Sequence, residues 1–161
     1  MSFSKIIKGL NYKQIFSLLG TFFKHPFFMI AAMNATLKTF SISQKEFPNI
    51  HGKHNKANAF RHALWNVLIA KKCTRFSNNQ ESVLNWTKEI TDWHEEFSPN
   101  EEIAKKMDLH NNQFGRDFFK KNNSLTTNQI VSELKNHLEM SVFVNSLDKI
   151  LDTSKMVYLE N

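Results

Sequence analysis

Apolar residues recur at every third or fourth position along most of this chain, the spacing that places them on one side of an α-helix. The clearest case is residues 80–97, with apolar side chains at Val83, Trp86, Ile90, Trp93 and Phe97. Only 4 Gly and 3 Pro occur among the 161 residues, too few for the many tight turns of a β-sandwich. The sequence therefore predicts an all-α fold, a single globular bundle of about six helices over residues 1–161.

The first part of the chain, residues 1–40, is expected to form a pair of helices that is basic and rich in Phe. Asn11, with a glutamine three positions later, is the predicted cap of the first helix. The dipeptide His25-Pro26 is expected to end that helix and to start the second, because proline is tolerated in a first helical turn. This second helix is expected to run to about Thr39.

An ordered loop over residues 41–54 is expected to lead into the motif-bearing helical core, which covers residues 48–119. Asn55 is the predicted cap of the first helix in this core, and that helix should end near Lys72. The next helix is the one over residues 80–97. The first assignment follows from a capping residue placed before an apolar stripe of helical spacing, and the second from such a stripe alone.

The last helix of the core is expected to begin at Ser98-Pro99, where a capping serine, a proline and two acids form a typical first turn. The C-terminal part, residues 127–161, is expected to hold a sixth helix that starts at Thr127. The tail KMVYLE, close to the end of the chain, is expected to be extended.

Positive charge is concentrated at the beginning of the chain. Residues 1–56 hold eight lysines and one acid, giving +7, whereas residues 57–161 hold 13 Lys and Arg against 14 acids, giving −1. The same N-terminal third contains eight of the 15 Phe. These features favour an anionic membrane surface as the partner, with nucleic acid less favoured. The plain alternative is a helical pair packed on the core with its lysines in solvent.

The apolar runs Ile15–Phe23 and Phe27–Met33 bear on localisation. Neither run reaches the ~20 residues needed to span a bilayer. The single cysteine, Cys73, excludes an internal disulfide and suits a reducing compartment. We therefore expect a cytoplasmic protein associated peripherally with a membrane. Lysines precede the first run and small residues follow the second, so secretion through a signal peptide stays open as an alternative.

Polar side chains lie within or beside the apolar side of three predicted helices, where burial is costly unless each group has a partner. In chain order these side chains are Arg61, His62, His94, His110 and Asn111. The acids that could pair with them are Asp92, Glu95 and Asp108. We therefore expect one polar cluster where the three helices meet, which is how helical bundles build metal and catalytic sites.

Metal-assisted hydrolysis is one chemistry for such a cluster, because His and carboxylate ligands suit Zn, Mn or Fe. The candidate metal ligands are His62, Asp92, His94, Asp108 and His110. The candidate catalytic residues are His62, His94, Glu95 and His110, with Glu95 as general base. The candidate substrate-binding residues are Arg61, Asn111, Asn112 and Arg116. Spacing counts against part of this set, because residues two positions apart, such as Asp92 and His94, do not share a helix face.

Two other schemes stay open. In one, no metal is used, and one histidine acts as base while another acts as acid. In the other, the cluster is the rigid polar core of a non-catalytic binding or immunity-type module. The hydrolase hypothesis favours an anionic ester, with phospholipid ahead of nucleic acid and a nuclease as the alternative. An open pocket at His62, His94 and His110 would favour chemistry, whereas a sealed and fully satisfied cluster would favour the module.

Three segments of the motif-bearing core resemble a bacterial domain family of unknown function. They are NKANAFRHALW from Asn55, DWHE from Asp92 and MDLHNNQFGR from Met107. Family members carry AFRHA-x-W, D-x-H-E or A-x-H-E, and MDLHNN-x-x-GR segments, and some lie at the ends of large secreted or toxin-like proteins. The resemblance covers roughly residues 48–119 and implies a shared site without naming a reaction. Relatives often carry an acid where this chain has Asn58, and if that acid is a ligand in them, the site here is altered.

Overall fold

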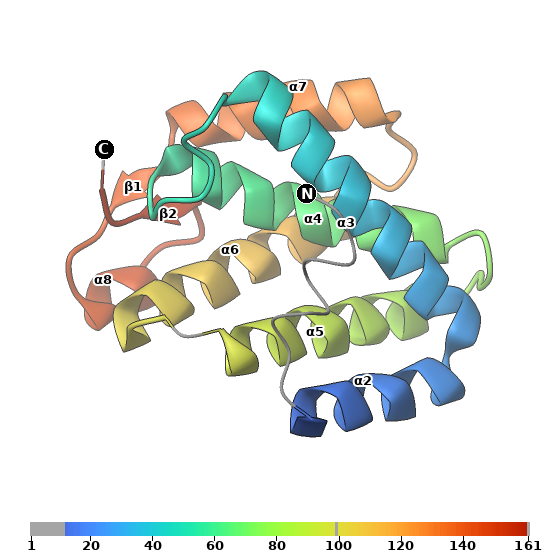
Figure 1. The fold of residues 1–161 in the computed structure, drawn as a ribbon. Coiled ribbons are helices and arrows are strands. Elements are labelled where there is room, and N and C mark those ends of the chain that lie inside the picture. The colour runs from blue at the N-terminus through green and yellow to red at the C-terminus, as the bar shows by residue number, and fades with distance from the viewer. Residues whose placement is uncertain (1–11, 99, 161) are drawn as a thin grey trace.

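The computed structural model describes residues 12–98 and 100–160, which form seven helices and two short strands (Figure 1). The helices are α2 (Tyr12–Lys24), α3 (Pro26–Glu46), α4 (Lys56–Cys73), α5 (Gln80–Phe97), α6 (Glu102–Lys121), α7 (Thr127–Glu139) and α8 (Leu147–Leu151). The strands are β1 (Val142–Phe143) and β2 (Val157–Tyr158). The prediction of an all-α fold is confirmed, and six of these helices correspond to the six expected from the sequence.

Side-chain caps explain why several helices begin where the sequence predicts. The Asn55 side chain accepts a hydrogen bond from the backbone N–H of Asn58 at the start of α4. Thr126 and Gln129 form a reciprocal capping box at the start of α7, satisfying backbone donors that the helix leaves free. The helix predicted over residues 80–97 is α5 with the same bounds.

Three local predictions need correction. The second helix does not stop at Thr39 but continues to Glu46, because no helix-breaking residue intervenes before Pro48. Ser98 does not begin the fifth helix; its hydroxyl donates to the carbonyl of His94, so it ends α5, and α6 starts at Glu102. The short helix α8 was not expected, since five residues are too few to show a period. The proposed caps at Asn11 and Pro99 lie outside the described residues.

Helix α4 occupies the middle of the bundle, with α3, α5, α6 and α7 around it (Figure 1). It is buried on nearly every side, and the side chains of Phe60, Leu64 and Ile69 have no exposed surface. Burial on nearly every side is typical of a core helix, whereas a surface helix buries only one side. The main hydrophobic core therefore forms around α4, and the polar residues on α4 are carried into that core.

The closest helix contact is between α4 and α6. Gly115 of α6 faces the backbone of Ala63 in α4, and a Cβ added at Gly115 would lie 2.3 Å from the Ala63 carbonyl oxygen. Only glycine allows the two backbones to approach this closely. Gly115 therefore permits the close packing of α6 against α4.

The C-terminal tail returns to pack against the start of α6. Strand β2 pairs in parallel with β1, in the register Val142 with Val157, so the predicted extended tail is confirmed. A small second apolar cluster lies beneath it. Of the described residues, none belongs to a helix that is both long enough and apolar enough to cross a membrane.

Replacing Gly115 by alanine is expected to destabilise the protein by about 1–3 kcal/mol or more, because the added methyl group forces α4 and α6 apart. Chemical denaturation followed by circular dichroism measures this change. The matched control is Gly20→Ala in α2, where nothing lies within 4 Å of the new Cβ. That substitution should leave stability unchanged or raise it by up to about 1 kcal/mol. Equal effects at the two glycines would contradict the close-packing argument.

Candidate functional site

Three helices place one ionisable side chain each at a common buried point. His62 lies on α4, Glu95 on α5 and Asp108 on α6, and their exposed fractions are 3%, 1% and 2%. One ligand atom of each residue lies within 4.8 Å of those of the other two. We call these three residues the acidic histidine cluster. All three were predicted to belong to one site.

The imidazole of His62 lies between the two carboxyl groups. Its Nδ1 is 3.4 Å from Oε1 of Glu95, and its Nε2 is 3.4 Å from Oδ1 of Asp108. Nδ1 is also 3.1 Å from the amide oxygen of Asn112, and Nε2 is 3.0 Å from a guanidinium nitrogen of Arg61. Since a guanidinium can only donate, this network assigns the proton of a neutral imidazole to Nδ1 and leaves the lone pair on Nε2.

Asn66 of α4 ties the histidine's surroundings together. Its amide N–H₂ donates to the Asn112 side-chain oxygen at 2.7 Å, and its own oxygen accepts from Thr91 and Arg116. Arg116, a predicted substrate-binding residue, is 5% exposed and also donates to Gln113 at 2.7 Å. This geometry holds Asn112 in the orientation that accepts from His62, much as outer-shell partners orient metal-binding histidines.

Two buried oxygens of the acidic histidine cluster have no hydrogen-bond partner among the described residues. They are Oε2 of Glu95 and Oδ1 of Asp108. The other oxygens of these carboxyls accept from Asn112 and Asn100, at 3.3 Å each. A buried polar atom without a partner costs about 1–3 kcal/mol, more when charged, so both atoms need an explanation in terms of function.

Arg61 is a charged neighbour of the acidic histidine cluster that is partly exposed to solvent. It is half-buried, its guanidinium donates to the His51 carbonyl at 2.6 Å, and it contacts Nε2 of His62. Its positive charge favours the ionised forms of Glu95 and Asp108 and disfavours a charged His62. The predicted proximity of Arg61 to the cluster is therefore seen in the structure, on the side facing residues 47–55.

Burial dominates the electrostatics of the acidic histidine cluster. It raises the pKa of Asp108 to about 8, with a further rise from the Glu95 charge that Arg61 partly offsets. It raises the pKa of Glu95 to about 7, although the hydrogen bond from Asn112 and the charge of Arg61 oppose this. Burial, Arg61 and His94 hold the pKa of His62 well below its usual range. His62 is therefore neutral, and its contacts with the carboxyl groups are not ion pairs.

His94 and Asp92 were predicted ligands, but the structure does not bring them into the acidic histidine cluster. The His94 ring is exposed and packs edge-on against Trp65, with ring centroids 5.2 Å apart. Desolvation by the surrounding protein, and then the charge of Arg61, lower the pKa of His94 to about 4, but its solvent-exposed surface limits that shift. Asp92 forms an ion pair with Lys88 on the outer part of α5. Glu95 points inward whereas His94 points outward, because adjacent residues of a helix do not share a face.

His110 and Asn111 serve the C-terminal tail rather than the acidic histidine cluster. His110 is half-buried and contacts the Lys155 carbonyl oxygen at 2.7 Å. The buried Asn111 amide pairs twice with Val157, donating to its carbonyl at 2.9 Å and accepting from its N–H at 3.0 Å. These hydrogen bonds therefore hold β2 and the residue Lys155 before it against α6. Whether either residue also contacts a substrate stays a prediction.

Several polar residues near the acidic histidine cluster were not predicted from the sequence. Asn66 was overlooked although it lies four positions after His62 and so shares its helix face. Asn58 lies four positions before His62 and is 2% exposed, with a side-chain oxygen that lacks a partner among the described residues. Thr91 and Asn100 gave no comparable signal, because short polar residues are common near helix ends and in connections.

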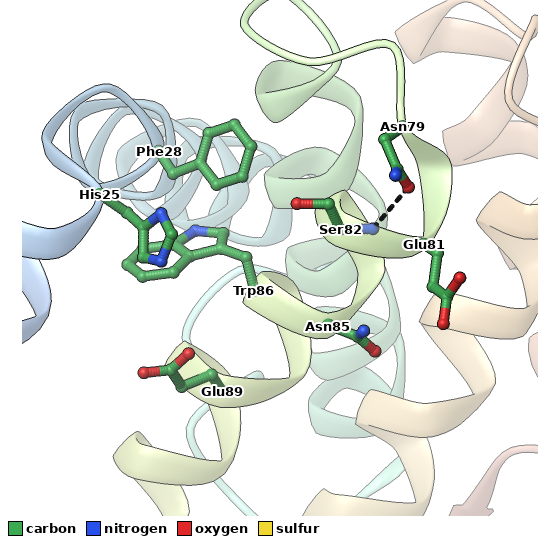
Figure 2. Close-up of a pocket in the computed structure, with 8 residues that line it drawn as sticks. All are labelled: His25, Phe28, Asn79, Glu81, Ser82, Asn85, Trp86 and Glu89. Atoms are coloured by element: carbon green, nitrogen blue, oxygen red, sulfur yellow. Dashed lines mark hydrogen bonds between the residues drawn. The ribbon is translucent and has the colours of Figure 1, made fainter.

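A pocket of about 330 Å³ lies elsewhere, where the junction of α2 and α3 meets the start of α5 (Figure 2). Figure 2 shows the rings of His25, Phe28 and Trp86 together on one side of it. The remaining lining residues are Asn79, Glu81, Ser82, Asn85 and Glu89. None of the predicted site residues lines this pocket. The sequence left open whether His62 lines an open pocket or is sealed, and in the structure His62 is sealed.

A mostly helical domain with a buried cluster of histidine and two carboxyl groups is the class of protein that this fold and site define. The chain belongs to the family described as a domain of unknown function (DUF6973), whose profile matches residues 19–142. This confirms the resemblance to a domain family of unknown function, and the matched range contains all of the acidic histidine cluster. Searches of curated proteins and of solved structures gave no match.

In the metal-free protein, the free energy of unfolding is expected to fall as pH rises from 6.5 to about 8. The folded pKa values of Asp108 and Glu95 lie above the unfolded ones, so folding binds protons that are lost in this range. The lowered pKa of His62 acts in the opposite direction, but only below 6.5. Urea denaturation at a series of pH values, in the presence of a chelator, measures the slope.

Asp108→Asn removes one of these protonation sites and should flatten the slope between pH 6.5 and 8. The matched control is Asp148→Asn, which changes an exposed acid of α8 and should keep the wild-type slope. A wild-type stability that rises through this range would show that the two carboxyl groups are ionised and paired in the folded protein.

Proposed function

We propose that the acidic histidine cluster binds one divalent metal ion, and that the protein uses this ion to hydrolyse an anionic ester. The observation that carries the proposal is the convergence of the Glu95 and Asp108 carboxyl groups on a neutral His62, because each carboxyl group has one buried oxygen without a partner among the described residues. A divalent cation would supply the positive charge and the coordination that these buried oxygens lack.

The distances fit an ion after a small rearrangement. Two ligands of one ion, each about 2 Å from it, can be at most about 4 Å apart, and the atoms of the acidic histidine cluster lie within 4.8 Å of one another. Nε2 of His62 carries the free lone pair and faces Asp108, so Glu95 would turn its free Oε2 towards that side. Arg61, which contacts the same nitrogen, would move outward.

The ligand types favour Zn, Mn or Fe. One imidazole and two carboxyl groups form a mixed nitrogen and oxygen set, which these ions accept. Three protein ligands are also the number found in catalytic zinc sites, where a further position is left for water or substrate. Asn112 supports this assignment because it fixes the Nδ1 proton of His62 and so presents Nε2 to the ion.

A bound ion would lower the pKa of a water molecule and polarise the ester oxygen. Hydrolysis adds the water's hydroxyl to the phosphorus or carbonyl carbon, and its proton goes to the oxygen that leaves. With Oε2 of Glu95 on the ion, Oε1 of the same carboxyl group is the proposed general base. Arg61 is the proposed anion-binding group, because it lies beside His62 and reaches the half-buried surface.

A phospholipid is proposed as the anionic ester ahead of a nucleic acid. Supporting this choice, the exposed Lys13, Lys24 and Lys38 lie on α2 and α3, which also carry exposed aromatic and aliphatic side chains. Lipid head groups and acyl chains match such a mixture better than a polyanionic backbone does. A peripheral position at a membrane surface inside the cell belongs to the same proposal.

The sealing of the acidic histidine cluster supports a second candidate, a non-catalytic module with a structural polar core. His62, Glu95 and Asp108 are each at most 3% exposed, so substrate entry requires movement of Arg61 and the adjacent residues 47–55. In this second candidate, the proton or ion held by the acidic histidine cluster would remain bound and would stabilise the fold. The two candidates differ in whether the purified protein turns over a phosphoester.

The metal proposal predicts one equivalent of Zn, Mn or Fe in protein purified without a metal-affinity tag or chelator. Elemental mass spectrometry measures the content, and titration calorimetry measures rebinding to the stripped protein. Glu95→Gln and Asp108→Asn should each weaken binding by more than the ~10–100-fold typical for loss of an outer-shell partner. Both variants keep the size of the original side chain and one oxygen that can accept from Asn112 or Asn100, so the helical fold should persist.

Asp92→Asn is the matched control, because Asp92 lies on the same helix as Glu95 but forms an ion pair with Lys88. It should retain the metal. Loss of metal in this variant alone, or no binding by the wild type, would overturn the assignment of ligands. Metal binding without hydrolysis of phospholipid or other phosphoester substrates would retain the site and favour the structural module.

A further inference from the structure

Helix α2 presents a line of exposed apolar side chains. Tyr12, Phe16, Leu19 and Phe23 are 68%, 71%, 44% and 77% exposed. Their spacings of four, three and four residues place them on one side of the helix. Phe22, by contrast, is half-buried and packs against the main core, so α2 is anchored by a different side from the exposed one.

The apolar surface continues onto the start of α3. Phe27 is 63% exposed and stacks on Phe76, itself 50% exposed, with ring centroids 5.5 Å apart. Ile30, one turn further along α3, is 45% exposed. We call this surface, formed by α2, the start of α3 and Phe76, the aromatic face. Contiguous exposed apolar surface of this kind marks an interaction site rather than ordinary surface composition.

Basic residues predominate on the two helices that carry the aromatic face, and the acids Glu81 and Glu89 of α5 line the pocket beside His25. Over residues 12–46 the chain has four lysines and a single acid. That acid, Glu46, lies at the far end of α3 and pairs with Lys135. Lys13 and Lys24 are exposed on α2 itself, and Arg75 is exposed next to Phe76. An apolar surface bordered by basic side chains complements a layer of anionic lipid head groups over acyl chains.

We propose that the aromatic face is a membrane-binding surface that lies on anionic lipid, with its Phe side chains in the acyl boundary and its lysines at the head groups. A 13-residue helix is too short to cross a bilayer, so α2 would lie in the plane of the interface. A second copy of the chain is a poorer occupant. A two-fold contact through this face would bring the same lysines together.

This proposal does not depend on the metal site, because none of the acidic histidine cluster lies on α2 or α3. Membrane binding can be measured without any enzymatic activity. Failure of metal binding would therefore leave the aromatic face untouched, and failure of lipid binding would leave the acidic histidine cluster untouched.

Flotation of the full chain with vesicles tests the proposal. Binding is expected to vesicles of equimolar phosphatidylglycerol and phosphatidylcholine, and it should be much weaker to phosphatidylcholine alone. Phe16→Ser and Phe23→Ser should each weaken partition about tenfold or more, since each removes one aromatic ring from the acyl boundary. Lys13→Gln and Lys24→Gln should each weaken it about fivefold.

Leu151→Ser is the matched control, because Leu151 is 81% exposed but lies on α8, away from α2 (Figure 1). It should bind vesicles like the wild type, and all five variants should retain the wild-type circular dichroism spectrum. Three results would overturn the proposal. They are no flotation with anionic vesicles, equal loss in the Leu151 variant, and a stable dimer in light scattering that the Phe16 and Phe23 variants abolish.

Discussion

The contact between α4 and α6 at Gly115 and Ala63 sets the geometry of the whole candidate site. Because no side chain separates the two backbones there, the residues one and two turns earlier on α6 come within reach of α4. Asn112 and Asp108 occupy those turns, and both face His62. A wider separation of the helices would remove the Asn112 acceptor that orients His62 and the contact between Nε2 of His62 and Oδ1 of Asp108.

The burial of α4 then decides the chemistry of what lies between these helices. A polar group carried into such a core must be satisfied by its neighbours, and most are: Asn66, Thr91, Asn112 and Arg116 form a connected network. Other buried atoms of the described residues also lack a partner, among them the Asn58 side-chain oxygen and the Trp86 ring nitrogen. The two carboxyl oxygens differ from these because they belong to the place where three ligand-type side chains converge.

Much of the fold could be predicted because apolar spacing, capping residues and the scarcity of glycine and proline act locally. The bounds of α5 and the start of α7 follow from such signals. Ser98 misled the prediction because a serine can end one helix as readily as begin the next. The cluster members His62, Glu95 and Asp108 could be named from the sequence, but their separation from His94 and His110 could not. Which side of each helix faces the site depends on how the three helices are rotated about their axes relative to one another. The spacing of residues within a single sequence does not give that rotation.

Helix α2 differs from α4 in how it is held, and this has a consequence for local opening. Its contacts are chiefly with α3, whereas α4 touches almost every other helix around it. Amide protons of α4 should therefore exchange with solvent only when the whole domain unfolds, while those of α2 can exchange through detachment of that helix alone. Helix α2, which is proposed to lie on a membrane surface, can then detach and rearrange repeatedly while the packing around His62 stays intact.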